Sequence, residues 1–201
     1  RLTRTDVTDA ALVVEGTVRQ AAVHKEYMEL RRRIEAPLGG TSFMVTDVVT
    51  NLSPRTQPHM ILYHCNFGWP LLSEHAVITV PATHSAPLDP RAENEAWATL
   101  APPRRGNEER CWLHTLRAGE VTVSLENKEA GLALDMSFDA GVLPGLVEWK
   151  MLGERQYVLG LEPTNGLCTG GRAKAREAGL LKTLAPGQSV TYALRFDARR
   201  L

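Results

Sequence analysis

Two short segments of this chain each carry one titratable side chain of a kind that moves protons. His64 lies within Tyr63–Pro70, and Glu162 lies within Gly160–Asn165. Each segment follows an apolar stretch and is crowded by glycine, proline, aromatic or apolar neighbours. Histidine and glutamate are two of the side chains most often used as general acids and bases. If the fold brings them together, His64 and Glu162 form an acid/base pair.

His64 is expected near the end of an extended strand. Alternate side chains of a strand point to opposite faces, so His64 and Asn66 share one face while Tyr63, Cys65 and Phe67 share the other. Apolar packing behind a polar pair is how a strand presents groups to a cleft. The alternative is a core histidine that is satisfied by a backbone carbonyl.

Glu162 is expected at the end of the apolar strand Tyr157–Leu161, directly before Pro163. Burial disfavours the ionised form of a carboxyl, so the pKa of Glu162 should be raised towards the range of a useful base. The alternative is a glutamate at a strand end that points into water.

Other candidate residues are weaker on their own. Trp149, next to Lys150, is typical either of a ring that stacks on a ligand or of the core. His59, His75, His84 and His114 show no metal-ligand spacing with Cys65 or Cys168. Nucleophile-elbow, phosphate-loop and dinucleotide motifs are missing as well. We therefore expect neither a metal nor a cofactor.

The overall composition indicates which kinds of partner and which cellular compartment to expect. The chain has 23 basic and 23 acidic residues, which gives no electrostatic case for binding nucleic acid or an anionic membrane. No apolar run approaches the ~20 residues of a membrane span, and the first residues are polar, unlike a signal peptide. Three widely spaced cysteines argue for a reducing compartment, so we expect a cytoplasmic protein.

Period-two alternation in short runs dominates the chain, and helical periodicity is scarce. Many strands at short spacing with turns between them predict an all-β sandwich or barrel. A proline-rich connection is expected over Pro81–Gly106, containing a helix at Pro90–Leu100, and a second helix is expected at Ala173–Leu181. The expected strands are Ala11–Val18, Glu26–Ile34, Ser42–Thr50, Met60–Phe67, Val77–Val80, Arg110–Leu116, Val121–Asn127, Gly131–Phe138, Leu146–Met151, Tyr157–Leu161 and Ser189–Phe196.

Several of these stretches together resemble the galactose mutarotase (aldose 1-epimerase) superfamily, most closely the branch known only as aldose 1-epimerase family proteins. The resemblance runs from about Gly16 to Phe196. The stretches that carry it are Asp47–Asn51, Met60–Leu72, Glu148–Met151, Tyr157–Asn165 and Leu184–Ser189.

The resemblance implies an antiparallel β-supersandwich and a catalyst that interconverts sugar anomers without a metal or redox cofactor. It implies His64 as the general acid and Glu162 as the general base. Asn66, Trp149, Lys150 and Asn165 are the candidates for contacts to a small-molecule sugar. Two alternatives stay open: a non-catalytic sugar-binding or sensor domain, and a sugar isomerase or epimerase that acts at another carbon.

The resemblance also predicts that part of the fold lies outside this chain. The family's N-terminal sheet, which supplies further sugar-binding groups, has no match here, and neither does its sugar-binding Asp, although Asp135 and Asp139 lie in the right region. We therefore expect residues 1–201 to form a single mutarotase-like β-sandwich domain that is the C-terminal portion of a larger one. Exposed strand edges would then make a homo-oligomer possible.

Overall fold

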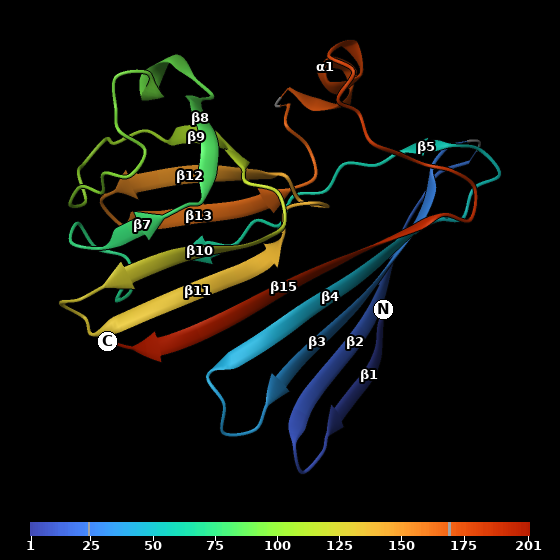
Figure 1. Ribbon diagram of the computed structural model, residues 1–201, viewed down its shortest axis with the longest axis horizontal. Coiled ribbons are helices and arrows are strands. Elements are labelled where there is room, and N and C mark those ends of the chain that lie inside the picture. Colours follow the sequence, from blue (N-terminus) through green and yellow to red (C-terminus); the bar gives the residue numbers. More distant parts are fainter. Residues whose placement is uncertain (24, 169) are drawn as a thin grey trace.

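The computed structural model describes residues 1–23, 25–168 and 170–201 and consists mostly of antiparallel strands (Figure 1). An eight-stranded sheet has the order β1-β2-β3-β4-β15-β11-β10-β7, and a five-stranded sheet has the order β6-β13-β12-β9-β8. A small third sheet pairs β14 with β5. The prediction of an all-β, antiparallel architecture is confirmed.

The elements have the following bounds: β1 Leu2–Val7, β2 Ala11–Ala21, β3 Tyr27–Pro37, β4 Ser42–Asn51, β5 Gln57–Pro58, β6 Asn66–Phe67, β7 Val77–Thr79, β8 Ala82–Pro87, η1 Pro90–Ala92, β9 Arg110–Leu116, β10 Glu120–Asn127, β11 Leu132–Asp139, β12 Gly145–Gly153, β13 Gln156–Thr164, α1 Gly171–Glu177, β14 Thr183–Leu184 and β15 Ser189–Arg200.

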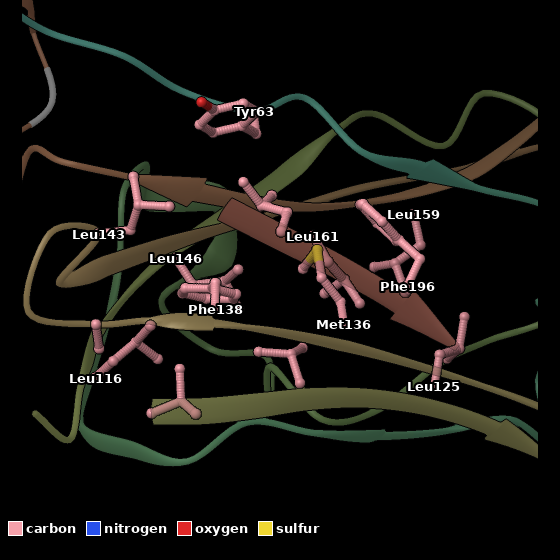
Figure 2. Close-up of a cluster of buried hydrophobic side chains, with 14 of the residues drawn as sticks. Tyr63, Leu116, Leu125, Met136, Phe138, Leu143, Leu146, Leu159, Leu161 and Phe196 are labelled. Carbon is pink, nitrogen blue, oxygen red and sulfur yellow. The ribbon is translucent and has the colours of Figure 1, made fainter. Parts of the chain in front are cut away.

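The main core lies between the two large sheets, where the five-stranded sheet covers β10, β11 and β15 (Figures 1 and 2). Alternate residues of each strand enter it, which is the period-two pattern of the sequence. The fully buried members with the largest hydrophobic side chains are Tyr192, Phe138, Leu72, Leu125, Met136, Leu143, Leu146, Leu159, Leu161 and Leu194.

The five-stranded sheet has an inner face towards this core and an outer face away from it. Leu159 and Leu161 of β13 point inward, so their neighbours Gly160 and Glu162 belong to the outer face. Gly160 lies opposite Trp149 of β12, which therefore belongs to the outer face too. The candidate residues Glu162 and Trp149 thus share one face of one sheet.

Three sequence-based predictions of local structure are wrong. The expected strand Met60–Phe67 pairs only at its end, as β6, and through an isolated bridge between Leu62 and Thr164. The helix expected at Pro90–Leu100 is only the single turn η1, which Asp89 caps by accepting from the Arg91 N–H. The connection expected over Pro81–Gly106 contains the edge strand β8, where proline is tolerated because one side of the strand needs no ladder partner.

Smaller differences concern element ends. Glu162 lies inside β13 rather than after its end, since the strand continues to Thr164. The second helix begins and ends earlier than Ala173–Leu181, and β1 has no counterpart among the expected strands. No helix among the described residues is long and apolar enough to span a membrane.

Within the described residues, part of the inner face of the eight-stranded sheet lies beyond the reach of the five-stranded sheet. The five-stranded sheet stops over β15, and β1 to β4 extend beyond it (Figure 1). By register, Val14 and Val18 of β2 share this face with Leu30 of β3 and Val49 of β4, yet 39% of Val14 and 62% of Val18 are exposed. We call this surface, formed by β1 to β4, the open apolar face.

Candidate active site

His64 and Glu162 meet across two neighbouring chain segments. The His64 Nε2 atom lies 3.0 Å from Oε1 of Glu162. The Glu162 side chain is almost fully buried, at 4% exposure, whereas 52% of the His64 side chain is exposed. The structure therefore brings together a buried carboxylate and an imidazole that solvent or a ligand can reach.

The glycine at position 160 leaves room for the carboxylate of Glu162. Glu162 and Gly160 lie two residues apart on the outer face of β13, and the Glu162 side chain folds back over Gly160. A Cβ atom at position 160 would lie 2.4 Å from Oε1 of Glu162. Gly160 is also paired with Asn66 on one side and with Trp149 on the other, so the carboxylate lies between these two residues.

Burial controls the protonation of Glu162. Desolvation raises the pKa of its carboxyl, and the nearby His64 opposes part of that rise. Oε1 receives no hydrogen bond of good geometry within the described residues, although Nε2 of His64 is close to it. A buried carboxylate oxygen that lacks a donor has strong affinity for a hydroxyl placed against it.

Two further residues fix the imidazole ring of His64. Nδ1 lies 2.9 Å from Oδ1 of Asn66, as expected for neighbours on one face of an extended segment. The indole of Trp149 packs against the imidazole with a centroid separation of 5.6 Å and an interplanar angle of 68°. Three side chains therefore surround the ring and leave part of it open.

Hydrogen bonds of Tyr63 hold the neighbouring His64 against β13. Tyr63 donates its backbone N–H to the carbonyl of Pro163, and its hydroxyl donates to Oδ2 of Asp47 at 2.8 Å. Asp47 is fully buried and accepts two hydrogen bonds from Arg32, at 2.8 and 2.6 Å. The segment that carries His64 is thus tied both to β13 and to the large sheet.

Lys150 and Asn165 are expected to contact a ligand, but the structure uses both in the interior. Lys150 faces the inner side of β12, where its ammonium binds the carbonyls of Trp97 and Thr99 and lies 3.1 Å from Glu148. The Asn165 side chain accepts from the N–H of Ile61 and donates to the carbonyl of His59. Neither polar group is left free for a ligand, so we exclude both residues from the proposed site.

Some residues that shape the site escape sequence reasoning. Glu109 accepts a hydrogen bond from the Trp149 indole at 2.8 Å, and nothing in its local sequence points to that contact. Gly160 carries a weak signal, as a glycine inside a strand often marks a close approach of other atoms. The Asp47–Tyr63 bond joins positions 16 apart and needs the fold to become visible.

Other chemistries find little support among the described residues. No group of three metal-ligating side chains occurs there. Burial raises the pKa of the Cys65 and Cys111 thiols to about 11, which keeps them protonated and poorly nucleophilic near neutral pH. A cavity of about 340 Å³ lies elsewhere, between β3 and the 58–61 segment, and neither His64 nor Glu162 lines it.

Comparison with models of known protein families assigns the chain to a family. Residues 1–198 match the model of a domain of unknown function, DUF4432. The chain belongs to the DUF4432 family. No curated protein matches this DUF4432 chain.

Solved structures show the fold of this DUF4432 chain. A candidate aldose 1-epimerase from Klebsiella pneumoniae matches with a TM-score of 0.87 and 25% identity, over 94% of this chain and 50% of that one. A galactose mutarotase-like protein from Clostridium acetobutylicum matches with a TM-score of 0.71 and 15% identity, over 100% of this chain and 66% of that one. The chain has the galactose mutarotase-like fold, and it spans half to about two-thirds of the length of these two structures.

Proposed function

We propose that this DUF4432 chain carries the acid/base pair of an enzyme that interconverts the anomers of a sugar, with Glu162 as the base and His64 as the acid. The observation that carries the proposal is the 3.0 Å contact between Nε2 of His64 and the buried Oε1 of Glu162. The fold that the chain shares with the Klebsiella and Clostridium structures supports the same reaction class.

The reaction needs two proton-transfer groups that are close neighbours. In a cyclic sugar the anomeric hydroxyl and the ring oxygen are bonded to the same carbon. A base at the hydroxyl and an acid at the ring oxygen must therefore lie side by side, as His64 and Glu162 do. A pair of groups at opposite walls of a wide cleft could not serve both oxygens at once.

The proposed steps conserve protons. Glu162 takes the proton of the anomeric hydroxyl while protonated His64 gives one to the ring oxygen, and the bond between C1 and that oxygen breaks. The open-chain aldehyde rotates about its C1–C2 bond. On closure onto the other face of the carbonyl, the hydroxyl formed from the ring oxygen bonds to C1 and gives its proton to neutral His64. Protonated Glu162 gives its proton to the carbonyl oxygen, which becomes the new anomeric hydroxyl, so both groups return to their starting states.

The environment of each group suits its proposed role. The raised pKa of Glu162 makes its carboxylate a stronger base than an exposed one. The half-exposed imidazole of His64 can exchange protons with water between turnovers. A positioned acid or base of this kind contributes typically ~10²–10⁴-fold to a rate.

Anomer exchange of free sugars is the direct test. Saturation-transfer NMR across a panel of neutral aldoses should show faster exchange between the α and β signals when the protein is added, for at least one sugar. The protein used should include whatever sequence adjoins these 201 residues in its natural form. Binding without faster exchange would favour the sugar-binding module, and signals of a new sugar would favour an epimerase or isomerase acting at another carbon.

A further inference from the structure

The indole of Trp149 is held from both sides. Its ring packs against the imidazole of His64 at 5.6 Å between centroids, and its N–H donates to Oε2 of Glu109 at 2.8 Å. An indole has one hydrogen-bond donor, so this bond uses the whole polar capacity of the side chain. Trp149 therefore has no donor left for a ligand, and its ring orientation depends on Glu109.

Glu109 is itself fixed by its surroundings. It directly precedes β9, which pairs with β12, the strand of Trp149. Its other carboxylate oxygen lies 3.7 Å from the Arg91 guanidinium. The next residue, Arg110, donates to Glu95 at 2.9 Å, which ties the start of β9 to the connection that follows η1.

The same connection is anchored on the other face of β12. The Lys150 ammonium, next to Trp149 in sequence, binds the carbonyls of Trp97 and Thr99. Tyr157 of β13 donates its hydroxyl to the carbonyl of Ala101 at 2.8 Å. The 88–109 connection that delivers Glu109 is thus fastened to the two strands that carry Trp149 and Glu162.

We infer that Glu109 is a positioning residue that acts on His64 through Trp149. Glu109 holds the indole of Trp149 in place. The indole in turn limits the rotations of the His64 imidazole that the hydrogen bond to Asn66 leaves free. The inference rests on the proposed function, in which His64 is the acid, and it adds a remote group that sets the geometry of that acid. Half-exposed imidazoles rotate easily, so an acid that must meet one ring oxygen gains from such a restraint.

A direct contact between Glu109 and the sugar is the competing explanation for an effect of Glu109 on the rate. The kinetic constants of variants distinguish a sugar contact from a positioning role. The side chain of Glu109 is 46% exposed, so a ligand could reach it. A residue that contacts the sugar should change the KM when it is removed. A residue that only positions His64 should lower the turnover number and leave the KM nearly unchanged.

The test is a double-mutant cycle with Glu109→Ala, Trp149→Phe and the double variant. We expect each single change to lower the turnover number about tenfold, since small errors in geometry are costly in catalysis. The double variant should be no slower than the slower single variant, because both changes break one chain of contacts. Glu109→Gln, whose amide oxygen can still accept from the indole, should recover most of the rate.

The chain offers a matched control at the neighbouring position. Glu108 is a carboxylate that is 67% exposed and lies 3.8 Å from Arg91, and the Trp149 indole donates its hydrogen bond to Glu109 instead. Glu108→Ala should keep the wild-type rate. Equal losses in Glu108→Ala and Glu109→Ala would show a general charge effect and would overturn the inference, as would additive losses in the double variant or a raised KM with unchanged turnover.

A readout without sugar keeps this inference separate from the proposed function. The indole ring current acts on the imidazole, so the ¹H–¹³C NMR signals of the His64 ring should move in Glu109→Ala and stay in place in Glu108→Ala. Unmoved His64 signals in Glu109→Ala, in a protein with a wild-type melting temperature, would contradict the inference. A shift of those signals in a protein that exchanges no anomers would support the restraint and refute the proposed catalysis.

Discussion

At the scale of single residues, the site depends on the absence of a side chain at Gly160 as much as on the side chains of His64 and Glu162. Glu162 can fold back towards His64 only because position 160 has no side chain, and its Oε1 atom then lies buried without a good donor. Such a carboxylate is costly to keep ionised in the folded protein, which is a common property of functional groups.

A methyl group at position 160 should displace the base. In Gly160→Ala the new Cβ would approach Oε1 of Glu162 to 2.4 Å, so the carboxylate must move and the exchange rate should fall about 10²-fold. Gly153→Ala is the matched control, since a Cβ there would meet its nearest atoms at ordinary distances of 3.7 Å. Equal exchange rates in both variants, measured by saturation transfer, would show that the position of the carboxylate does not matter.

The raised pKa of Glu162 also predicts how stability depends on pH. Burial raises this pKa above the ordinary 4.5, so the folded state binds the proton more tightly than the unfolded state does. The contribution of the carboxyl to stability is present below the unfolded pKa and is lost as the pH rises through the folded pKa. Glu162→Gln, which stays neutral, should therefore melt at or above the wild-type temperature at pH 7.

Thermal melting at two pH values checks this expectation. The difference between Glu162→Gln and wild type should shrink at about pH 4, where the wild-type carboxyl is largely protonated. A variant that melts well below wild type at pH 7 would mean that the contact with His64 outweighs the cost of desolvation.

At the scale of elements, the strands that carry alternating residues were predictable and the segment that carries His64 was not. β9 to β13 and β15 follow period-two patterns with turns between them, so local sequence defines them. The 60–65 segment is apolar like a strand, yet it is held by bonds to β13 and by Tyr63 on Asp47, which no local pattern reveals. The same reasoning explains β8, which follows Pro81 and ends at Pro87 and so resembles a loop in sequence, although proline fits the outer edge of a sheet.

The candidate site divides in a similar way. His64, Glu162, Asn66 and Trp149 are brought together on one side of the five-stranded sheet. Lys150 follows Trp149 directly, and the alternation of a strand sends it to the opposite face, so the two could not both line the site. Asn165 lies beyond the end of β13, where its amide satisfies the backbone of the 59–61 segment.

Removing one hydroxyl should loosen the segment that carries His64. Tyr63→Phe deletes the hydrogen bond to the buried Asp47, and bonds to charged groups contribute on the order of 2 kcal/mol to stability. Chemical denaturation should show that loss, and the exchange rate should fall more than stability alone explains. Tyr27→Phe, at an exposed tyrosine of β3, should change neither the stability nor the exchange rate. An equal effect at both positions would show that the Tyr63 hydroxyl has no special role in holding the segment of His64.

At the scale of the whole molecule, the open apolar face sets the behaviour of the chain in isolation. Exposed valines of β2 continue the core face of the large sheet beyond its covered half, and a cavity of about 370 Å³ opens among Val14, Val18, Leu30 and Ile34. Large exposed apolar surfaces on strands promote association. The sequence alone indicated these alternating residues but not which half of the sheet is left uncovered.

The 201-residue chain should therefore self-associate when it is expressed alone. Val18→Ser, within the open apolar face, should reduce that association in light scattering. Val23→Ser removes the same side chain from a turn where it is 83% exposed, and it should leave association unchanged. A stable, catalytically active monomer of the unaltered 201 residues would show that the open apolar face needs no cover.

The account depends most on the roles of Glu162 and His64, and one measurement tests them directly. The rate constant of anomer exchange at saturating sugar should fall at least ~10²-fold in Glu162→Gln and in His64→Asn, with sugar binding and the fold retained. Saturation-transfer NMR gives this rate constant, and melting temperatures and sugar titrations show that fold and binding persist. Exchange at the wild-type rate in a folded Glu162→Gln variant would contradict the assignment of the base and, with it, the proposed mechanism.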